Sequence, residues 1–399
     1  MNFIGIDVSR GKSKATVITS EYEISNFSFK HNVVGFKKLE EVITSKDSIV
    51  IFEITGVYSA QLARFLRTKS VKFIELNPLE ANMRMATLRR DKTDTKDSMK
   101  LALLGVTQLD NLNGRRYCNP DYVPLRVLAT RYEELISERT RIINHLHSSL
   151  ELSFPELNKI FNPIRSVISL QIIKSYTHPD FLIGLTINQM VDEVYKVIGK
   201  HITRKLIYSY CQKVWQASKT SYPAIDVDSL EIPIIIQYCD EIEAYNHRIE
   251  NVKYQLVKQA AVKPEYPILC SIPGSGRLNS ALLLGFVGNL NRFKSYKKLN
   301  AFVGIDLNRY QYGQSKKRDS INRRGNTSAR LVEFEMVRSM LRNKGRIKNH
   351  LVDYYYKLKK PPYSKHDLVA LIACANHLNR TIINLARTNQ VYDYNKTAH

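Results

Sequence analysis

The sequence predicts a mixed α/β domain at the N-terminus, followed by a mainly helical remainder. In the first hundred residues, short apolar segments with strand periodicity alternate with segments of helical periodicity. Beyond about residue 125, helical spacing dominates and includes two long amphipathic stretches. The 399-residue chain is 44% hydrophobic and 24% charged, which is typical of a folded protein of two or three domains.

The N-terminal segments follow a definite order. Three predicted strands are followed by a helix, a strand, a helix, a strand and a helix: "NFIGIDV", "KATVITS", "YEISNFSF", "VVGFKKLEEVI", "SIVIFEI", "SAQLARFLRTK", "VKFIEL" and "KDSMKLALLG". This is the order of a ribonuclease-H-like (RNase H-like) domain, a mixed sheet with helices. We assign it to residues 1–111.

Residues 112–262 are predicted to form a linker and a helical, coiled-coil region. The turn-rich "LNGRRYCNPDYVP" is the linker, and a long basic helix follows it. A second long helix carries a seam of about three heptads: Ile235, Tyr238, Ile242, Tyr245, Ile249, Val252 and Leu256. Two interpretations stay open, a helix packed on its own core or a coiled coil between chains. Residues 155–230 read as mixed and helical, without a chemical motif.

Residues 263–390 form a predicted C-terminal, mainly helical domain, and residues 391–399 a tail. In "LCSIPGSGRLNSALLLGFVG", a Gly-x-Gly turn joins two apolar helical segments, as in a helix-hairpin-helix. The backbone around Gly274 and Gly276 could then hold a phosphate, although "PGSG" is also an ordinary turn. The basic "RYQYGQSKKRDSINRRGN" reads as a loop facing an anionic partner or as a solvated charged surface.

The charge balance indicates a polyanionic partner. Lys and Arg number 60 against 37 Asp and Glu, a net charge of +23, and nucleic acid is the leading candidate. The start of the chain has no secretory pattern and no membrane anchor is evident, so we expect a cytoplasmic protein. The five scattered cysteines indicate buried small side chains rather than disulfides or a zinc site.

Four carboxylates are candidates for a metal site. The first strand of an RNase H-like sheet lies beside the fourth, so Asp7 and Glu53 would point into one cleft, which Asp94 and Asp97 on the last helix could close. Four like charges repel one another unless cations lie between them. Hard oxygen ligands suit Mg²⁺ or Mn²⁺, and two such ions are the usual arrangement for phosphodiester displacement.

Other interpretations of these residues stay open. Each carboxylate taken singly is more often structural. Asp94 could be a helix cap, and Asp97 could lie favourably at the positive end of the helix dipole. We leave Asp91 outside the metal set. Actin-like and sugar-kinase ATPases also begin with a strand ending in "GID", but they need a second phosphate loop that we do not find after residue 110.

Eight ordered blocks across nearly the whole chain resemble the DEDD transposases of bacterial insertion sequence family 110, related to the Piv DNA invertases. They are "FIGIDVS", "FEITGVY", "ELNP", "DKTDTKDSMKLA", "HSSLELSFPEL", "LCSIPGSG", "FVGIDLNRYQYGQ" and "NRRGN". The resemblance implies a RuvC-like nuclease domain, a coiled-coil region and a transposase domain. It implies a homo-oligomer, a dimer or tetramer, around DNA (element ends and target) and a structured bridge RNA. It also implies a metal quartet of Asp7, Glu53, Asp94 and Asp97.

The resemblance implies strand transfer through a serine that becomes covalently attached to DNA, and here the chain departs from the pattern. The position of that serine holds Tyr312. Three alternatives follow: Tyr312 is the nucleophile, Ser315 takes the role, or strand transfer is lost and a nucleic-acid-binding protein remains. Candidate nucleic-acid contacts are Arg139, Asn144, Gly274, Gly276, Arg309, Lys316, Lys317, Arg318, Arg323 and Arg324.

Overall fold

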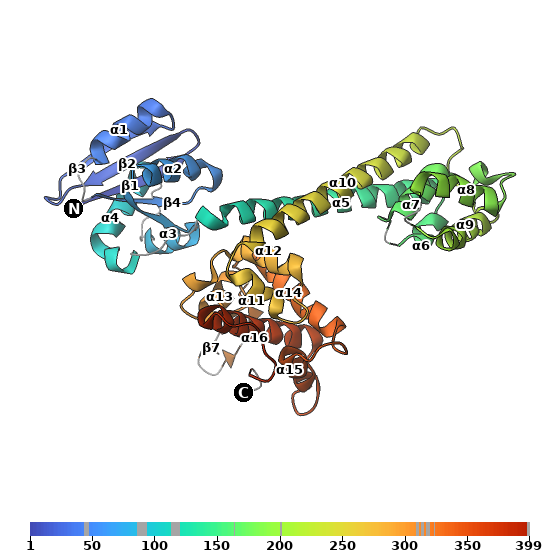
Figure 1. The fold of residues 1–399 in the computed structure, drawn as a ribbon. Helices are drawn as coiled ribbons and strands as arrows, with labels where there is room; N and C mark the ends of the chain where they lie inside the picture. Colours follow the sequence, from blue (N-terminus) through green and yellow to red (C-terminus); the bar gives the residue numbers. More distant parts are fainter. Residues whose placement is uncertain are drawn as a thin grey trace. The chain divides into compact units, whose positions relative to one another are not determined.

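The chain divides into two compact units, Met1–Asn119 and Pro120–His399 (Figure 1). The computed structural model describes residues 1–43, 48–85, 94–112, 120–162, 164–199, 202–308, 311–312, 315–316, 320–322 and 324–396. Each unit has its own apolar cores and is described by itself. The boundaries predicted at residues 111, 262 and 390 stay predictions.

The first unit is an α/β domain, as the sequence predicts. Its elements are β1 (Asn2–Ser9), β2 (Lys12–Ile18), β3 (Ile24–Lys30), α1 (Val33–Ile43), β4 (Ser48–Glu53), η1 (Gly56–Ser59), α2 (Ala60–Thr68), β5 (Lys72–Leu76), α3 (Pro78–Met85) and α4 (Asp94–Leu112). The predicted order is confirmed, with α3 as an addition. This helix has only eight residues, too few for a helical period to stand out from its surroundings.

A mixed five-stranded sheet of order β3-β2-β1-β4-β5 forms the centre of this unit. β1 and β4 are parallel neighbours, as are β4 and β5, whereas β2 pairs antiparallel with β1 and with β3. Residues of β1 and β4 alternate between two cores: Ile4, Ile6 and Phe52 pack with α1 and α2, and Ile51 packs with α3 and α4. Ile6 and Phe52 point to the α1 and α2 face, so the residues next to them along each strand point to the α4 face.

The second unit is almost entirely helical. Its helices are η2 (Pro120–Tyr122), α5 (Val123–Ser153), α6 (Glu156–Ile160), α7 (Val167–Ser175), η3 (Pro179–Leu182), α8 (Ile187–Ile198), α9 (Arg204–Ser218), α10 (Glu231–Ala261), α11 (Glu265–Ser271), α12 (Arg277–Val287), η4 (Leu290–Arg292), α13 (Tyr296–Val303), α14 (Thr327–Arg342), α15 (His350–Lys359) and α16 (Asp367–Thr388). Two short strand pairs, β6 (Leu307–Asn308) with β9 (Ser320–Ile321) and β7 (Gln311–Tyr312) with β8 (Ser315–Lys316), complete it.

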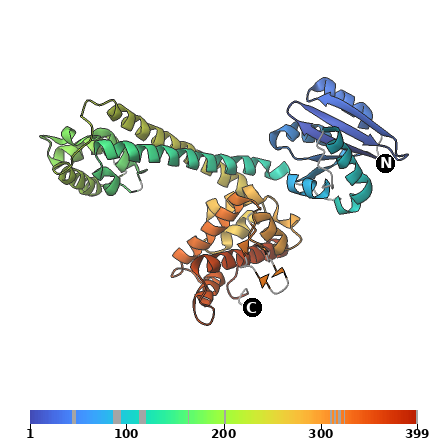
Figure 2. The same ribbon diagram turned by 180° about the vertical axis from the view of Figure 1, so that it is seen from behind.

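The predicted heptad seam lies on α10 and is covered by the same chain. α10 and α5 run side by side in both ribbon views (Figures 1 and 2). Ile235, Ile242 and Leu256 of the seam are fully buried in the intrachain cores. The structure therefore favours the interpretation of a helix packed on its own domain over that of a coiled coil between chains.

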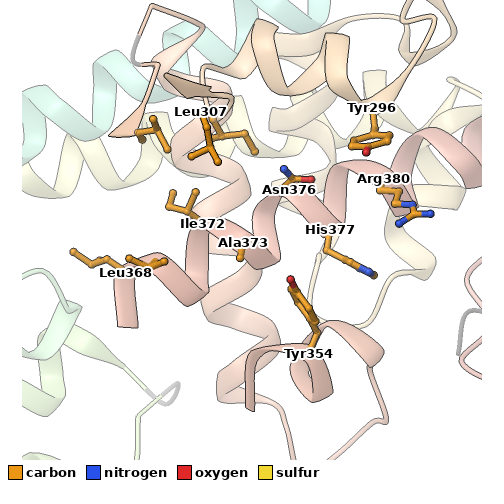
Figure 3. A pocket seen from close by; sticks show the side chains of 12 residues that line it. Tyr296, Leu307, Tyr354, Leu368, Ile372, Ala373, Asn376, His377 and Arg380 are labelled. Atoms are coloured by element: carbon orange, nitrogen blue, oxygen red, sulfur yellow. The ribbon is translucent and has the colours of Figure 1, made fainter. Parts of the chain in front are cut away.

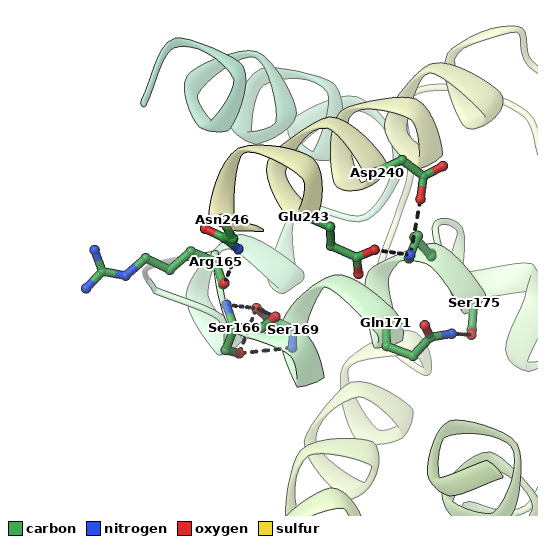
Figure 4. Close-up of polar contacts among 9 residues, drawn as sticks. Arg165, Ser166, Ser169, Gln171, Ser175, Asp240, Glu243 and Asn246 are labelled. Carbon is green, nitrogen blue, oxygen red and sulfur yellow. Dashed lines mark hydrogen bonds and ion pairs between the residues drawn. The ribbon is translucent and has the colours of Figure 1, made fainter. Parts of the chain in front are cut away.

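Polar contacts fix α10 against α7 and the residues just before it (Figure 4). Lys174 donates from Nζ to Asp240 Oδ1 at 3.1 Å and to Glu243 Oε2 at 2.9 Å. One turn further along α10, Asn246 Nδ2 donates to the carbonyl of Arg165 at 3.1 Å. These bonds set the register of α10 over α7, because each joins a fixed position of α10 to its neighbour.

The C-terminal core is built around α16. Residues 367–388 are long and apolar enough to cross a membrane, but 56% of the most apolar stretch is buried inside the protein, the pattern of a core helix. The predicted burial of the cysteines is confirmed for Cys211, Cys239 and Cys374, whereas Cys270 is half-buried. Cys118 lies outside the described residues.

Candidate active site and nucleic-acid interface

Asp7 and Glu53 occupy equivalent positions on neighbouring parallel strands. Ile6 of β1 is in register with Phe52 of β4, and each candidate carboxylate is the next residue along its strand. Because side chains alternate across a strand, Asp7 shares a face with Gly5, and Glu53 shares a face with Ile51. Both carboxylates thus stand on the α4 face of the sheet, at the C-terminal ends of the adjacent strands β1 and β4.

The N-terminal half of α4 is seated directly on the strand that carries Asp7. A Cβ atom added at Gly5 would lie 2.1 Å from the carbonyl oxygen of Ser98 and 2.3 Å from the amide nitrogen of Ala102. The hydroxyls of Thr16 and Ser98, both buried, are hydrogen-bonded at 2.8 Å. This close approach of helix backbone to strand backbone needs a residue without a side chain at position 5.

The first turn of α4 brings the other two carboxylates to this edge. Asp94 and Asp97 are the acidic residues of that turn, and Asp97 directly precedes Ser98. Asp94 is exposed, whereas Asp7, Glu53 and Asp97 are half-buried. Asp91 lies outside the described residues. Three secondary-structure elements therefore carry the four predicted carboxylates to one end of one sheet face.

The carboxylates suit a hard divalent cation by chemistry, but they are not gathered as a finished ligand set. Within the described residues, no group of three or more His, Cys, Asp or Glu side chains is close enough to hold a metal ion. The backbone placement and the oxygen chemistry fit the predicted metal, whose binding stays a prediction.

Lys14 is a functional candidate that the sequence analysis missed. It pairs directly with Asp7 across the β1–β2 hairpin, and its Nζ donates to Thr95 Oγ1 at 2.5 Å. Its ammonium therefore lies beside the first turn of α4, at Thr95, which follows Asp94 in the sequence. Counting outward from the two-residue turn Arg10–Gly11 pairs Asp7 with Lys14, so the sequence contained the signal.

The C-terminal candidates lie on two short antiparallel strand pairs. The β7–β8 pair sets Tyr312 directly opposite Ser315, so the two candidate nucleophiles are backbone neighbours without any shift of the loop. Lys316 lies on β8, opposite Gln311. Arg324, exposed, follows β9, and its backbone N–H donates to Asn322 Oδ1 at 3.2 Å. The remaining basic candidates lie outside the described residues: Arg309, Lys317, Arg318 and Arg323.

The predicted Gly-x-Gly turn joins α11 to α12. Gly274 and Gly276 have φ values of +91° and +68°, a backbone conformation that glycine adopts without strain. A Cβ at Gly274 would also lie 2.7 Å from Cα of Met340. Gly276 is the exposed N-cap of α12. The predicted glycine turn between two helices is confirmed, while its identity as a helix-hairpin-helix and its contact with phosphate stay predictions.

The two candidates on α5 differ in what they contact. Arg139 is half-buried, and its Nη1 donates to Asn246 Oδ1 of α10 at 2.8 Å. Burial, assisted by the charge of Arg165, lowers the pKa of Arg139. Arg139 thus already joins α5 to α10, which leaves less of its guanidinium for a nucleic-acid backbone. Asn144 is exposed on the same helix.

Comparison with known proteins agrees with the resemblance seen in the sequence. A family model described as a transposase matches residues 4–155, and a second, described as the transposase IS116/IS110/IS902 family, matches residues 266–352. The chain is 22% identical over 313 residues to the insertion element IS116 uncharacterized 44.8 kDa protein of Streptomyces clavuligerus, covering 76% of this chain and 75% of that protein.

A second relative is the insertion element IS110 uncharacterized 43.6 kDa protein of Streptomyces coelicolor. It is 21% identical over 251 residues, covering 61% of this chain and 59% of that protein. The two matched family models lie in the same order as the α/β unit and the C-terminal helices, and together they cover more than half of the sequence. The chain belongs to the IS116/IS110/IS902 family of transposases.

Proposed function

We propose that this transposase cuts and rejoins DNA by metal-dependent phosphodiester transfer, with the α/β unit as an RNase H-like (RuvC-like) nuclease domain. The observation that carries the proposal is the placement of Asp7 and Glu53 at equivalent positions on β1 and β4, beneath the acidic first turn of α4. Metal ions bound there would activate the attacking oxygen and stabilise the leaving oxygen of the phosphodiester.

Each element of the α/β unit has a distinct part in this proposal. Asp7 and Glu53 stand on the rigid sheet and would fix the position of two Mg²⁺ or Mn²⁺ ions. Asp94 and Asp97 stand on a helix end and would complete the ligand set by turning inward. Lys14 would supply a positive charge at the rim, where a DNA phosphate enters.

The C-terminal candidates would form the covalent link to DNA. A hydroxyl oxygen of Tyr312 or Ser315 would bond to phosphorus while the bond from phosphorus to the departing strand oxygen breaks. Their direct pairing in the β7–β8 hairpin supports treating them as alternatives at one position. The basic residues around them would hold the backbone of the strand.

We further propose that a structured bridge RNA guides the choice of DNA and that the chain acts in the cytoplasm as a dimer or tetramer. The support is the resemblance to insertion sequence family 110 together with the net charge of +23. Such a charge strengthens binding to any nucleic-acid backbone.

A strand-transfer assay with single-residue variants tests the metal site. The full chain is incubated with DNA carrying element ends, the flanking noncoding RNA and Mg²⁺, and products are resolved on denaturing gels. We expect Asp7→Asn and Glu53→Gln to abolish joined products while DNA binding is retained. The matched control is Glu40→Gln, a carboxylate on α1 that forms an ion pair with Lys69 at 2.6 Å. Full activity in both metal-site variants would refute the proposal.

The second candidate function is a DNA-binding protein of this family without strand transfer. The observation that favours it is Tyr312 at the position of the family serine. A covalent protein–DNA adduct that disappears in Tyr312→Phe would assign the nucleophile, and one that disappears in Ser315→Ala would assign the alternative. If no variant or metal gives an adduct while DNA still binds, the binding protein is the correct description.

A further inference from the structure

Two adjoining hollows lie beside α16 in the C-terminal core. The first, here the apolar hollow, has a volume of about 530 Å³ and lies among α13, the β6–β9 pair, α15 and α16. Figure 3 shows how the lining changes across the hollow: Leu307 and Ile372 lie toward one side, Arg380 lies toward the other, and Asn376 lies between them. The hollow therefore offers hydrocarbon contact at one end and hydrogen-bonding groups at the other.

The second, here the polar hollow, has a volume of about 390 Å³ and is lined mainly by polar groups. Three of its lining residues are cations: Arg380, Arg387 and Lys396. Neither hollow has an Asp or Glu among the described residues that line it. Three cations without a carboxylate attract an anion and disfavour a metal ion.

The two hollows share one wall. Tyr296, His377 and Arg380 line both of them. The ring of His377 stacks on Tyr354, with centroids 5.1 Å apart and planes 28° apart, and the guanidinium of Arg380 lies 6.0 Å from the centroid of Tyr296. Burial, assisted by the charge of Arg380, lowers the pKa of His377, which favours a neutral ring. A single ligand that spans this wall would meet aromatic surface and then positive charge.

We propose that the two hollows together bind one unstacked nucleotide of a DNA strand, with its base in the apolar hollow and its phosphate in the polar one. This proposal rests on the proposed function. A base has flat faces that stack on Tyr296 or Tyr354 and an edge that the exposed amide of Asn376 can read. A phosphate suits the fork of Arg380. A purely hydrocarbon ligand would make no ionic contact with the three cations of the polar hollow.

The position of the apolar hollow relates it to strand transfer. Leu307 and Ile321 are paired in register across β6 and β9, and both line the hollow. Leu307 and Ile321 flank, along the chain, the segment that carries Tyr312 and Ser315. A base held between them would belong to the strand whose phosphate that segment attacks, which is why we assign DNA rather than RNA.

Binding of bulged DNA to the full chain tests the proposal. Fluorescence anisotropy compares three labelled duplexes of one sequence: fully paired, with a single extra base, and with an abasic residue at the bulge. We expect the base bulge to bind about tenfold tighter than the other two, in line with the energy of stacking one base on an aromatic side chain. Arg380→Ala should remove most of this preference, and Arg338→Ala, an exposed arginine of α14, should keep it.

Two further variants separate loss of the site from loss of the fold. Asn376→Leu changes an exposed residue, and Ala373→Phe fills the hollow without changing charge. Ala373→Phe should abolish the preference for the base and Asn376→Leu should weaken it, and both should leave the melting temperature and binding to paired DNA unchanged. Unchanged preference in both variants would overturn the proposal, as would a preference confined to bulged RNA, even if the metal-site variants behave as proposed.

A third outcome would assign the hollow to contact between chains. If Ala373→Phe abolishes oligomers in light scattering and leaves the bulge preference intact, the hollow is covered by a second copy, and the proposal is wrong. Loss of strand transfer in Asp7→Asn with normal bulge preference would leave both proposals standing. Normal strand transfer in that variant would refute the metal site without bearing on the hollows.

Discussion

Substitution of Gly5 by alanine should separate α4 from the sheet and disable the candidate metal site. The added methyl would lie 2.1 Å from the Ser98 carbonyl oxygen and 2.3 Å from the Ala102 amide nitrogen. Ordinary contact needs more than 3 Å, so the helix must retreat by about 1 Å. Both obstructing atoms are backbone atoms of one helix, and neither can rotate away as a side chain would.

The expected cost follows from the rigidity of the contact. Overpacking a core by one methyl group typically costs about 1–3 kcal/mol, and the backbone clash places Gly5→Ala at about 3 kcal/mol. Gly105→Ala should cost less, about 1–2 kcal/mol, because its methyl would meet side-chain atoms of Ile51 and Phe3, at 2.5 and 2.6 Å, rather than backbone atoms. Gly345, with no atom within 4 Å of the added Cβ, is the neutral control.

Hydrogen exchange of the full chain, followed by mass spectrometry, measures this effect locally. Peptides from β1 and α4 should exchange about 100-fold faster in Gly5→Ala, and those from the second unit should not change. Mg²⁺-dependent strand transfer should fall by at least about tenfold, because metal ligands tolerate shifts of only about 0.2 Å. Wild-type exchange rates in β1 and α4 would refute the reasoning, since they would mean that α4 is not seated on Gly5.

Three further predictions follow from charged and buried groups. Lys14→Met should lower the Mn²⁺ concentration for half-saturation about three- to tenfold, because a nearby positive charge is removed; unchanged affinity in calorimetry would contradict it. Burial raises the pKa of Glu333 well above its ordinary value, so its ionisation destabilises the fold increasingly as the pH rises above about 4. Glu333→Gln should therefore raise the melting temperature at pH 8 and have little effect at pH 4; a loss of stability at pH 8 would refute this. Tyr122→Phe removes the buried hydroxyl that lies 2.8 and 2.7 Å from the two carboxylate oxygens of Glu265, and should cost about 1–3 kcal/mol in urea unfolding. A cost below about 0.5 kcal/mol would show that the carboxylate finds another donor.

Much of the fold could be predicted because period and apolar pattern are local properties. α1 begins and ends at the predicted residues, and the order of strands and helices in the first unit is the predicted one apart from α3. The seam of α10 was equally visible in the sequence, but the helix that covers it was not. An apolar seam on a helix predicts that another surface covers it, but it does not say which one. Only the tertiary structure identified that surface as α5 of the same chain.

Some features of the candidate site could likewise be predicted from the sequence, and others could not. The identity of the four carboxylates and the adjacency of β1 and β4 followed from the pattern of the chain. Ordinary spacing rules could not reveal that the ammonium of Lys14 reaches Thr95 or that Thr16 bonds to Ser98, because these contacts join residues about eighty positions apart. The hollows beside α16 could not be seen in the sequence either, because their linings come from α13, β6, β9, α15 and α16, which meet only after folding.

The amino-acid sequence by itself determined that this protein has an α/β unit, long helices, a strong positive charge and the residue blocks of a transposase family. Tertiary structure decided which helix lies on Gly5, what covers the α10 seam and where hollows remain. The physical reason is that backbone preference and amphipathic periodicity act over a few residues. Close packing is instead settled between surfaces that the chain brings together from distant positions.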